Sequence, residues 1–278
     1  MIQDIGEHTF DNQYHPCPPD RESYALYYED HAALVRKYPD RIEFPKFRDI
    51  ERLNEDIYED AVYLFSIDGE RYYLVEEINR ERQSHFTMEN TEIFRYAEPQ
   101  YLAFAGITGY QLHNWYQSRR FCGKCGRRMK KDGKERMRYC ESCHNMEFPK
   151  ICPAVIIGVT DGDKILMSKY AGRTYKKYAL LAGFTEIGET LEETVQREVM
   201  EEVGLKVKNI RYYKSQPWSF TDTLLMGFYC DLDGGAAITL DREELAMAEW
   251  FQRDEIPVEP ERDSITNEMI IRFKNGEV

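Results

Sequence analysis

Three glutamates in the second half of the chain have the residue type and the spacing to bind a metal ion. Glu198, Glu201 and Glu202 stand at positions i, i+3 and i+4, which a helix brings to neighbouring places on its surface. Hard divalent cations such as Mg²⁺ and Mn²⁺ prefer oxygen ligands and are commonly shared with substrate phosphates. The spacing therefore points to a metal site for a di- or triphosphate ester.

The residues around these glutamates predict an amphipathic helix. Thr190 and Glu193 form a capping box, and Gly204 stands where a helix would end in a left-handed residue. An apolar stripe steps by four along one face, through Leu191, Val195, Val199 and Val203. Glu202 projects between members of this stripe and Glu198 lies beside it. Carboxylates next to a buried face are costly unless positive charge neutralises them, which a divalent cation would do.

The alternative for a glutamate-rich helix is a solvated face of salt bridges. That alternative fits Glu192 and Glu193 but not Glu198 and Glu202, because only the latter pair lies at the apolar stripe. Arg197 is one helical turn from Glu193 and from Glu201, so we expect it to orient carboxylates. Its alternative role is an ordinary surface ion pair.

Four of the seven cysteines form two tight pairs, Cys122-x-x-Cys125 and Cys140-x-x-Cys143, fourteen residues apart. This spacing predicts one structural Zn²⁺ per chain with four thiolate ligands, which leaves no open position for catalysis. A redox dithiol and a nucleic-acid-binding ribbon are the alternatives. Basic residues flank the cysteines and could contact phosphate, although a solvated surface also explains them: Arg119, Arg120, Lys124, Arg127, Arg128, Lys130 and Lys131.

The chain divides by composition into three parts, which we predict as an N-terminal mixed α/β domain (1–118), a zinc ribbon (119–150) and an α/β domain (151–278). In the first part, residues 61–65 and 72–75 surround Asp68-Gly69 and predict a β-hairpin. Apolar residues at helical spacing between 102 and 116 predict a helix before the first cysteine pair. Residues 154–159 and 164–167 predict the first two strands of the last domain.

Charge and hydropathy exclude some classes of function. The 278 residues include 37 Lys and Arg against 50 Asp and Glu, a net charge of −13, which does not suit a protein whose main task is to bind nucleic-acid backbone. No apolar run approaches the ~18–20 residues of a membrane span. The N-terminal residues lack the basic and apolar regions of a signal peptide. We therefore expect a cytoplasmic protein with no membrane partner.

Residues Gly183 to Leu205 resemble the Nudix box at every fixed position: a Gly, five residues, a Glu, seven residues, and then Arg-Glu-apolar-x-Glu-Glu-x-Gly-apolar. Downstream, residues 215–218 read Ser-Gln-Pro-Trp, similar to a signature of the NADH pyrophosphatase branch of the Nudix hydrolases. That branch also carries a four-cysteine zinc ribbon directly before the Nudix domain. The resemblance covers the chain from about residue 100 to its end.

The resemblance implies a fold and an activity. The fold is a Nudix α/β/α sandwich in a homodimer, and the activity is hydrolysis of the pyrophosphate of NAD(H) to nicotinamide mononucleotide and AMP. Some members of the branch remove NAD caps from RNA. By motif position, the catalytic Mg²⁺ or Mn²⁺ is held by Glu198, Glu201 and Glu202, by Glu244, and by the main-chain carbonyl of Ala182. Glu201 is a candidate general base.

The resemblance also implies which residues bind the dinucleotide substrate: Phe184, Phe148, Gln216, Trp218 and Phe220. For Phe184 and Phe148, core packing is the alternative. We expect further positive charge near the phosphates from Lys150, Arg173, Lys176 and Lys177.

One departure from the branch affects the expected substrate. The branch continues its signature with two prolines around an aromatic residue, whereas residues 219–223 read Ser-Phe-Thr-Asp-Thr. Proline stiffens a loop, so its loss changes the grip on the nicotinamide half. Another nucleoside diphosphate derivative or NAD-capped RNA is therefore an alternative substrate. A non-catalytic nucleotide-binding protein on a Nudix scaffold is the alternative of a different class.

Overall fold

The computed structural model describes residues 1–54, 56–79, 85–172 and 176–278, and these divide into two compact units. The N-terminal unit comprises residues 2–150 with 219–221, and the C-terminal unit comprises Met1, 151–218 and 222–278. The division into three domains at 118 and 150 stays a prediction. Arg173, from which we expected additional positive charge, lies outside the described residues.

The C-terminal unit is built on a six-stranded mixed sheet with the strand order β15-β16-β12-β13-β17, in which β14 also pairs with β12. Its strands are β12 (Cys152–Asp161), β13 (Lys164–Tyr170), β14 (Leu181–Phe184), β15 (Val207–Trp218), β16 (Thr223–Leu232) and β17 (Leu245–Gln252). The predicted strands at 154–159 and 164–167 are confirmed within β12 and β13. Strand β12 runs parallel to β16 and antiparallel to β14.

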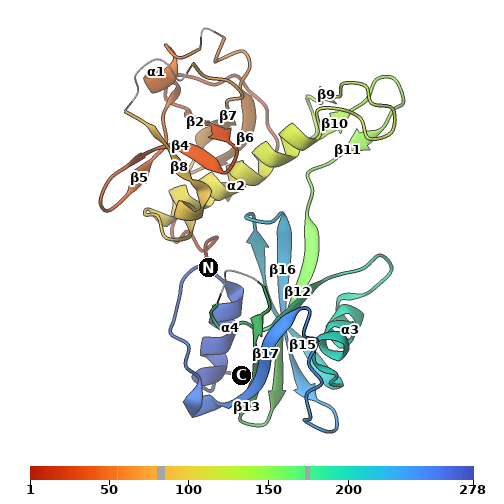
Figure 1. Cartoon of the computed structure of the whole chain (residues 1–278). Helices are drawn as coiled ribbons and strands as arrows, with labels where there is room; N and C mark the ends of the chain where they lie inside the picture. The colour runs from red at the N-terminus through yellow and green to blue at the C-terminus, as the bar shows by residue number, and fades with distance from the viewer. Residues whose placement is uncertain (55, 80–84, 173–175) are drawn as a thin grey trace. The chain divides into compact units, whose positions relative to one another are not determined.

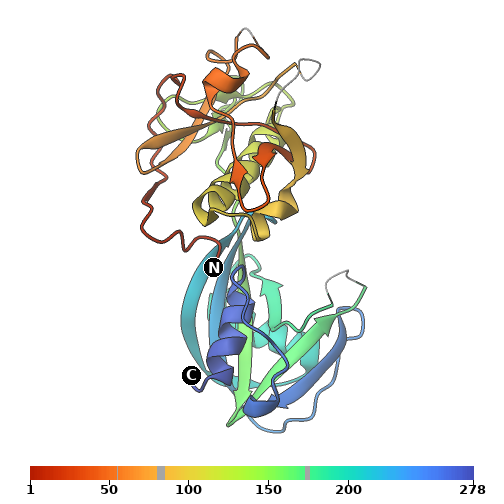
Figure 2. The same ribbon diagram turned by 90° about the vertical axis from the view of Figure 1, so that its left-hand side faces the viewer.

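Two helices cover opposite faces of this sheet, α3 (Leu191–Val203) and α4 (Ile265–Lys274) (Figure 1). Side chains alternate along β12, so that Val155 and Ile157 share a core with α3, whereas Ile156 joins the core under α4. Figure 2 shows α4 lying against its face of the sheet. The expected α/β/α sandwich is therefore confirmed. The short helix η2 (Arg253–Glu255) follows β17.

The N-terminal unit combines two small sheets with the long helix α2 (Gln100–Ser118) (Figure 1). One sheet consists of β1 (Phe10–Asp11), β6 (Val62–Ile67), β7 (Glu70–Leu74) and β2 (Tyr24–Leu26). The other consists of β3 (Tyr28–Glu29), β4 (Ala32–Lys37), β5 (Ile42–Glu43) and β8 (Thr87–Asn90). The short helices are α1 (Phe47–Ile50) and η1 (Thr91–Arg95).

Both predictions for this unit are confirmed. Strands β6 and β7 form the expected antiparallel hairpin, and Asp68 and Gly69 turn it with positive φ values of 53° and 79°, the conformation that Asp-Gly hairpin turns adopt. Helix α2 buries Leu102, Ala105 and Trp115 in the core of the unit.

The segment after α2 forms a three-stranded sheet in the order β11-β10-β9, from β9 (Lys130–Lys131), β10 (Arg138–Tyr139) and β11 (Met146–Glu147). Its own apolar core is small, with Met129 packed among the cysteines. Among the helices of the described residues, none is long and apolar enough to cross a membrane.

Candidate active site

The predicted helix is confirmed as α3, with the predicted ends. The Thr190 hydroxyl accepts from the backbone N–H of Glu193, whose carboxylate accepts from the backbone N–H and the hydroxyl of Thr190. Gly204 ends the helix at a φ of +68°. The valines of the apolar stripe are buried, and Glu198 and Glu202 beside them are only 8% and 2% exposed. The expected burial of these two carboxylates is therefore observed.

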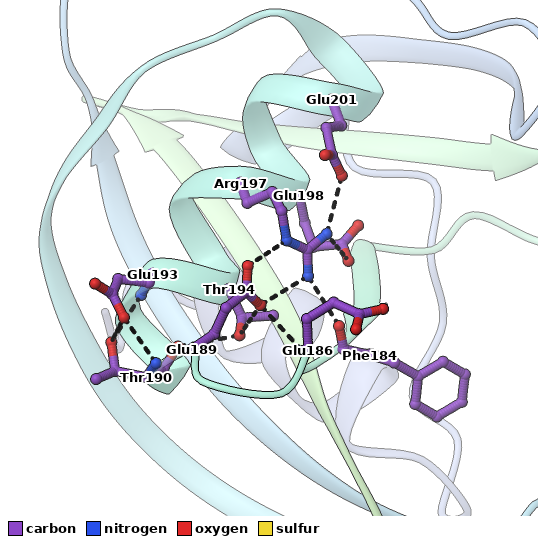
Figure 3. A network of polar contacts seen from close by, with 9 residues as sticks. All are labelled: Phe184, Glu186, Glu189, Thr190, Glu193, Thr194, Arg197, Glu198 and Glu201. Atoms are coloured by element: carbon purple, nitrogen blue, oxygen red, sulfur yellow. Dashed lines mark hydrogen bonds and ion pairs between the residues drawn. The ribbon is translucent and has the colours of Figure 1, made fainter.

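Arg197, in the middle of this helix, donates hydrogen bonds to four groups on the helix and on the segment that precedes it (Figure 3). Its Nε and Nη2 donate to the two carboxylate oxygens of Glu189, at 2.5 and 3.0 Å. Its Nη1 donates to Glu198 at 2.7 Å and to Glu201 at 2.9 Å, and Nη2 donates to the carbonyl of Phe184 at 2.9 Å. The guanidinium thus fixes two of the predicted metal ligands relative to the loop that precedes the helix.

Glu189 is a site residue that our choice of candidates missed. It lies in the loop, one residue before the helix cap, and both of its carboxylate oxygens accept from one edge of the Arg197 guanidinium. We had expected Glu193 near Arg197, but the Glu193 carboxylate is used at the cap. The fixed Glu of the Nudix box was the signal that could have identified Glu189.

Glu189 and Glu198, two of the carboxylates that accept from Arg197, have pKa values shifted in opposite directions. The hydrogen bonds from Arg197 lower the pKa of Glu189 to about 2. Burial raises the pKa of Glu198 above its ordinary value; Arg197 opposes this shift, and the charges of Glu201 and Glu244 add to it. Glu244 is therefore close enough to act on Glu198 electrostatically.

The donor set around Glu198 suits a hard divalent cation. The negative charges of Glu201 and Glu244 act on the buried carboxyl of Glu198. A bound cation would therefore favour the ionised form of Glu198. Ala182, whose carbonyl we expected to assist, directly precedes Gly183 in β14, the strand next to α3. Within the described part of the chain, however, only the four cysteines bring at least three ligand atoms within 4.8 Å of one another.

The cysteines meet as expected for one tetrahedral zinc site. Their four sulfurs lie within 4.8 Å of one another, with Cys122 to Cys143 at 3.5 Å and Cys125 to Cys140 at 3.4 Å. Zinc–sulfur bonds of about 2.3 Å imply sulfur separations of roughly 3.8 Å. Burial opposes ionisation of Cys122, but the backbone N–H groups of Lys124 and Cys125 outweigh it and lower the pKa of the thiol to about 6. The residues therefore fit a zinc ion.

Comparison with known proteins identifies both parts of this arrangement. Residues 150–273 match the NUDIX domain family, and residues 117–148 match the NADH pyrophosphatase zinc ribbon domain family. Residues 150–273 thus form a Nudix domain, and the residues directly before it match the zinc ribbon of the NADH pyrophosphatases. Both matches support the resemblance to the NADH pyrophosphatase branch.

Two curated relatives of this chain share one name. A protein named NAD-capped RNA hydrolase NudC from Photorhabdus laumondii is 41% identical over 58% of this chain and 63% of its own length. A protein of the same name from an Enterobacter species is 41% identical over 58% of this chain and 62% of its own length. This chain thus spans less than two thirds of either relative. A crystal structure of a NUDIX hydrolase from Nitrosomonas europaea has 24% identity and a TM-score of 0.49, covering 56% of this chain and 90% of that one.

Two of the three phenylalanines expected to bind substrate lie on the surface of their units. Phe184, at the end of β14 in the Nudix unit, and Phe148, in the N-terminal unit, are each 56% exposed. Their alternative role, packing in the core of this chain, is therefore wrong. Contact with a nucleotide stays a prediction for both.

The residues of the Ser-Gln-Pro-Trp signature form the end of β15 and differ in burial and contacts. Gln216 is fully buried, and its amide donates to the carbonyl of Asp263 at 2.8 Å and accepts from the backbone N–H of Ile265 at 2.7 Å. It thereby holds the start of α4, and direct contact with substrate stays a prediction. Trp218 pairs with Thr223 at the end of the β15–β16 hairpin.

The loop of this hairpin, in which the two prolines of the branch are lost, belongs partly to the other unit. Phe220 packs against the core of the N-terminal unit, where the guanidinium of Arg95 lies 4.4 Å from its ring centroid. Asp222 turns the loop with a φ of 57°. Among the expected cations, Lys177 forms an ion pair with Glu261, and the carbonyl of Lys150 accepts from Gln111.

Proposed function

We propose that this protein hydrolyses the pyrophosphate bond of NAD(H), releasing nicotinamide mononucleotide and AMP, with Mg²⁺ or Mn²⁺ as catalytic cation. The observation that carries the proposal is the buried Glu198, held by the Arg197–Glu189 fork beside Glu201 and Glu202. The names of the relatives, which refer to NAD-capped RNA, support a substrate with an NAD pyrophosphate.

Glu198, Glu201, Glu202 and Glu244 would hold the cation, with the carbonyl of Ala182. A bound divalent cation neutralises phosphate charge and lowers the pKa of a bound water. Arg197 keeps Glu198 and Glu201 in place, since it also bonds the loop through Glu189 and the carbonyl of Phe184. Among the three glutamates of α3, Glu201 is the exposed one, and it is the candidate general base. Glu198 can bind the cation only in its ionised form.

The test is product analysis with NADH and Mg²⁺ or Mn²⁺, beside the variant Glu202→Gln. The proposal expects AMP and reduced nicotinamide mononucleotide from the natural protein and no turnover from the folded variant. Glu192→Gln is the matched control, because Glu192 is an exposed carboxylate in the first turn of the same helix, and it should retain activity. If both variants bind NADH while neither they nor the natural protein cleave it, the non-catalytic alternative is correct.

NAD-capped RNA is a second candidate substrate, which the charge of the zinc ribbon favours. Residues 119–150 hold eleven Lys and Arg against four Asp and Glu, a local net charge of +7 in a chain of −13. Such a segment attracts a phosphate backbone. The test compares the specificity constants for NAD-capped RNA and free NADH at 50 and 200 mM salt. A preference for capped RNA that disappears at high salt would favour this substrate. A homodimer, which the resemblance implies, and a cytoplasmic location, which we expect from the sequence, complete the proposal.

A further inference from the structure

The N-terminal unit contains a cavity of about 620 Å³, for which the proposed reaction has no use. It lies among β2, β4, β5, α1 and the first turn of α2. Cavities of roughly 300–1,000 Å³ commonly bind small molecules. All of the lining residues belong to this one unit.

The charge of the lining differs from that of the whole chain. Four cations line the cavity, Arg36, Arg41, Lys46 and Arg48, against the two carboxylates of Glu43 and Asp49. The lining therefore carries a formal charge of +2 in a chain of −13. A cavity that concentrates positive charge in an acidic protein favours an anionic ligand.

Three of these cations form ion pairs that a phosphate could replace. Arg41 pairs with Asp40 at 3.7 Å and with Glu43 at 3.3 Å. Lys46 pairs with Glu22 and Glu70, and Arg48 pairs with Glu22 and Asp49. The side chain of Glu22 is largely exposed, and ion pairs with such a partner are weak, so a phosphate could exchange with it at little cost.

Arg36 is the cation best placed for a ligand. It has no acidic group within 4.0 Å among the residues that the structure describes, and its guanidinium lies 4.9 Å from the ring centroid of Tyr38. A guanidinium that contacts a ring and no carboxylate can still donate its N–H groups to the oxygens of a phosphate.

Aromatic rings complete the lining. Tyr24, Phe86 and Tyr101 are partly exposed, and Phe44 is buried. One face of the Tyr24 ring stacks on Tyr72 with the centroids 4.6 Å apart, and the centroid of the Tyr101 ring lies 4.1 Å from that of His8. Rings beside cations suit a ligand that has both a flat base and a phosphate, because bases stack on aromatic side chains. Inorganic phosphate would leave these rings unused.

We propose that this cavity, between the cations Arg36, Arg41, Lys46 and Arg48 and the rings of Tyr24, Phe86 and Tyr101, binds a nucleoside 5′-phosphate. The lining residues all belong to the N-terminal unit, whereas α3 belongs to the C-terminal unit. The proposal does not depend on the hydrolytic activity proposed above.

The experiment is calorimetric titration of the full-length, zinc-loaded protein with AMP, adenosine and inorganic phosphate, without added Mg²⁺ or Mn²⁺. We expect AMP to bind at least tenfold more tightly than either fragment. Arg36→Gln should weaken AMP binding at least tenfold. Lys37→Gln is the matched control, because Lys37 neighbours Arg36 on β4, pairs with Glu89 instead, and does not line the cavity. It should bind AMP as the natural protein does.

A second pair of variants separates the two sites. Arg48→Gln, at an exposed lining position, should weaken AMP binding even if Arg36→Gln fails to fold, whereas Phe184→Ala should leave this binding event unchanged. The proposal is overturned if AMP does not bind at millimolar concentration, if phosphate alone binds as well as AMP, or if Phe184→Ala abolishes binding while the cavity variants do not. Loss of NADH turnover in Glu202→Gln bears only on the proposed reaction.

Discussion

The carboxyl group of Glu198 occupies the space that a side chain on Gly183 would need. A β carbon at Gly183 would lie 1.9 Å from the carboxyl carbon of Glu198 and 2.0 and 2.4 Å from its oxygens. An alanine at this position would therefore have to displace the Glu198 carboxylate, which is the flexible end of its side chain.

Gly183→Ala should displace this carboxylate and lower kcat roughly 10²-fold, the typical effect of moving a catalytic group by about 1 Å. The measurement is turnover of NADH together with thermal unfolding. Gly235→Ala is the control, because its β carbon would meet no atom within 4 Å, and it should retain full activity. Undiminished turnover in Gly183→Ala would show that the position of Glu198 does not limit the reaction.

Arg197→Lys should reduce activity although it keeps the positive charge. A lysine ammonium cannot donate in parallel to both oxygens of Glu189 and also reach Glu198, Glu201 and the carbonyl of Phe184. We expect a loss of about 10–100-fold in metal affinity or activity, as for other residues that orient metal ligands. Titration of activity with Mn²⁺ distinguishes the two effects. Equal metal dependence and equal kcat in the variant would contradict a positioning role.

How much of this site could be predicted depends on how local its interactions are. Thr190, Gly204 and the valine stripe act within one helix, so their spacing alone predicted its ends and its buried face. The contact between Gly183 and Glu198 joins a strand to a helix, and the sequence pattern does not give its distance. Phe220 was expected at the substrate, yet it packs against a core formed by residues more than a hundred positions earlier.

The depressed pKa of Glu189 predicts a pH-dependent contribution to stability. Because Arg197 holds the folded-state pKa at about 2, below the ordinary value of 4.5, the folded protein binds fewer protons than the unfolded chain between these values. The contribution is therefore complete above about pH 5 and is lost as the pH falls towards 2. Urea unfolding should show that Glu189→Gln destabilises the protein at pH 7 and does so less at pH 3.5. A difference that is independent of pH would show that Glu189 acts through packing instead of charge.

Removal of zinc should unfold the ribbon, because the ribbon has only a small apolar core of its own. Its core consists of Met129 packed among Cys122, Cys140 and Cys143, and domains with so small a core depend on a structural metal. Cys140→Ser should lose the single bound zinc and expose the amides of residues 120–147 to hydrogen exchange. Cys17→Ser, at an exposed cysteine of the same unit, should keep one zinc and normal protection. The measurements are the metal content of both variants by mass spectrometry and their hydrogen-exchange rates. A protected ribbon in zinc-free Cys140→Ser would mean that the fold of this segment does not need the ion.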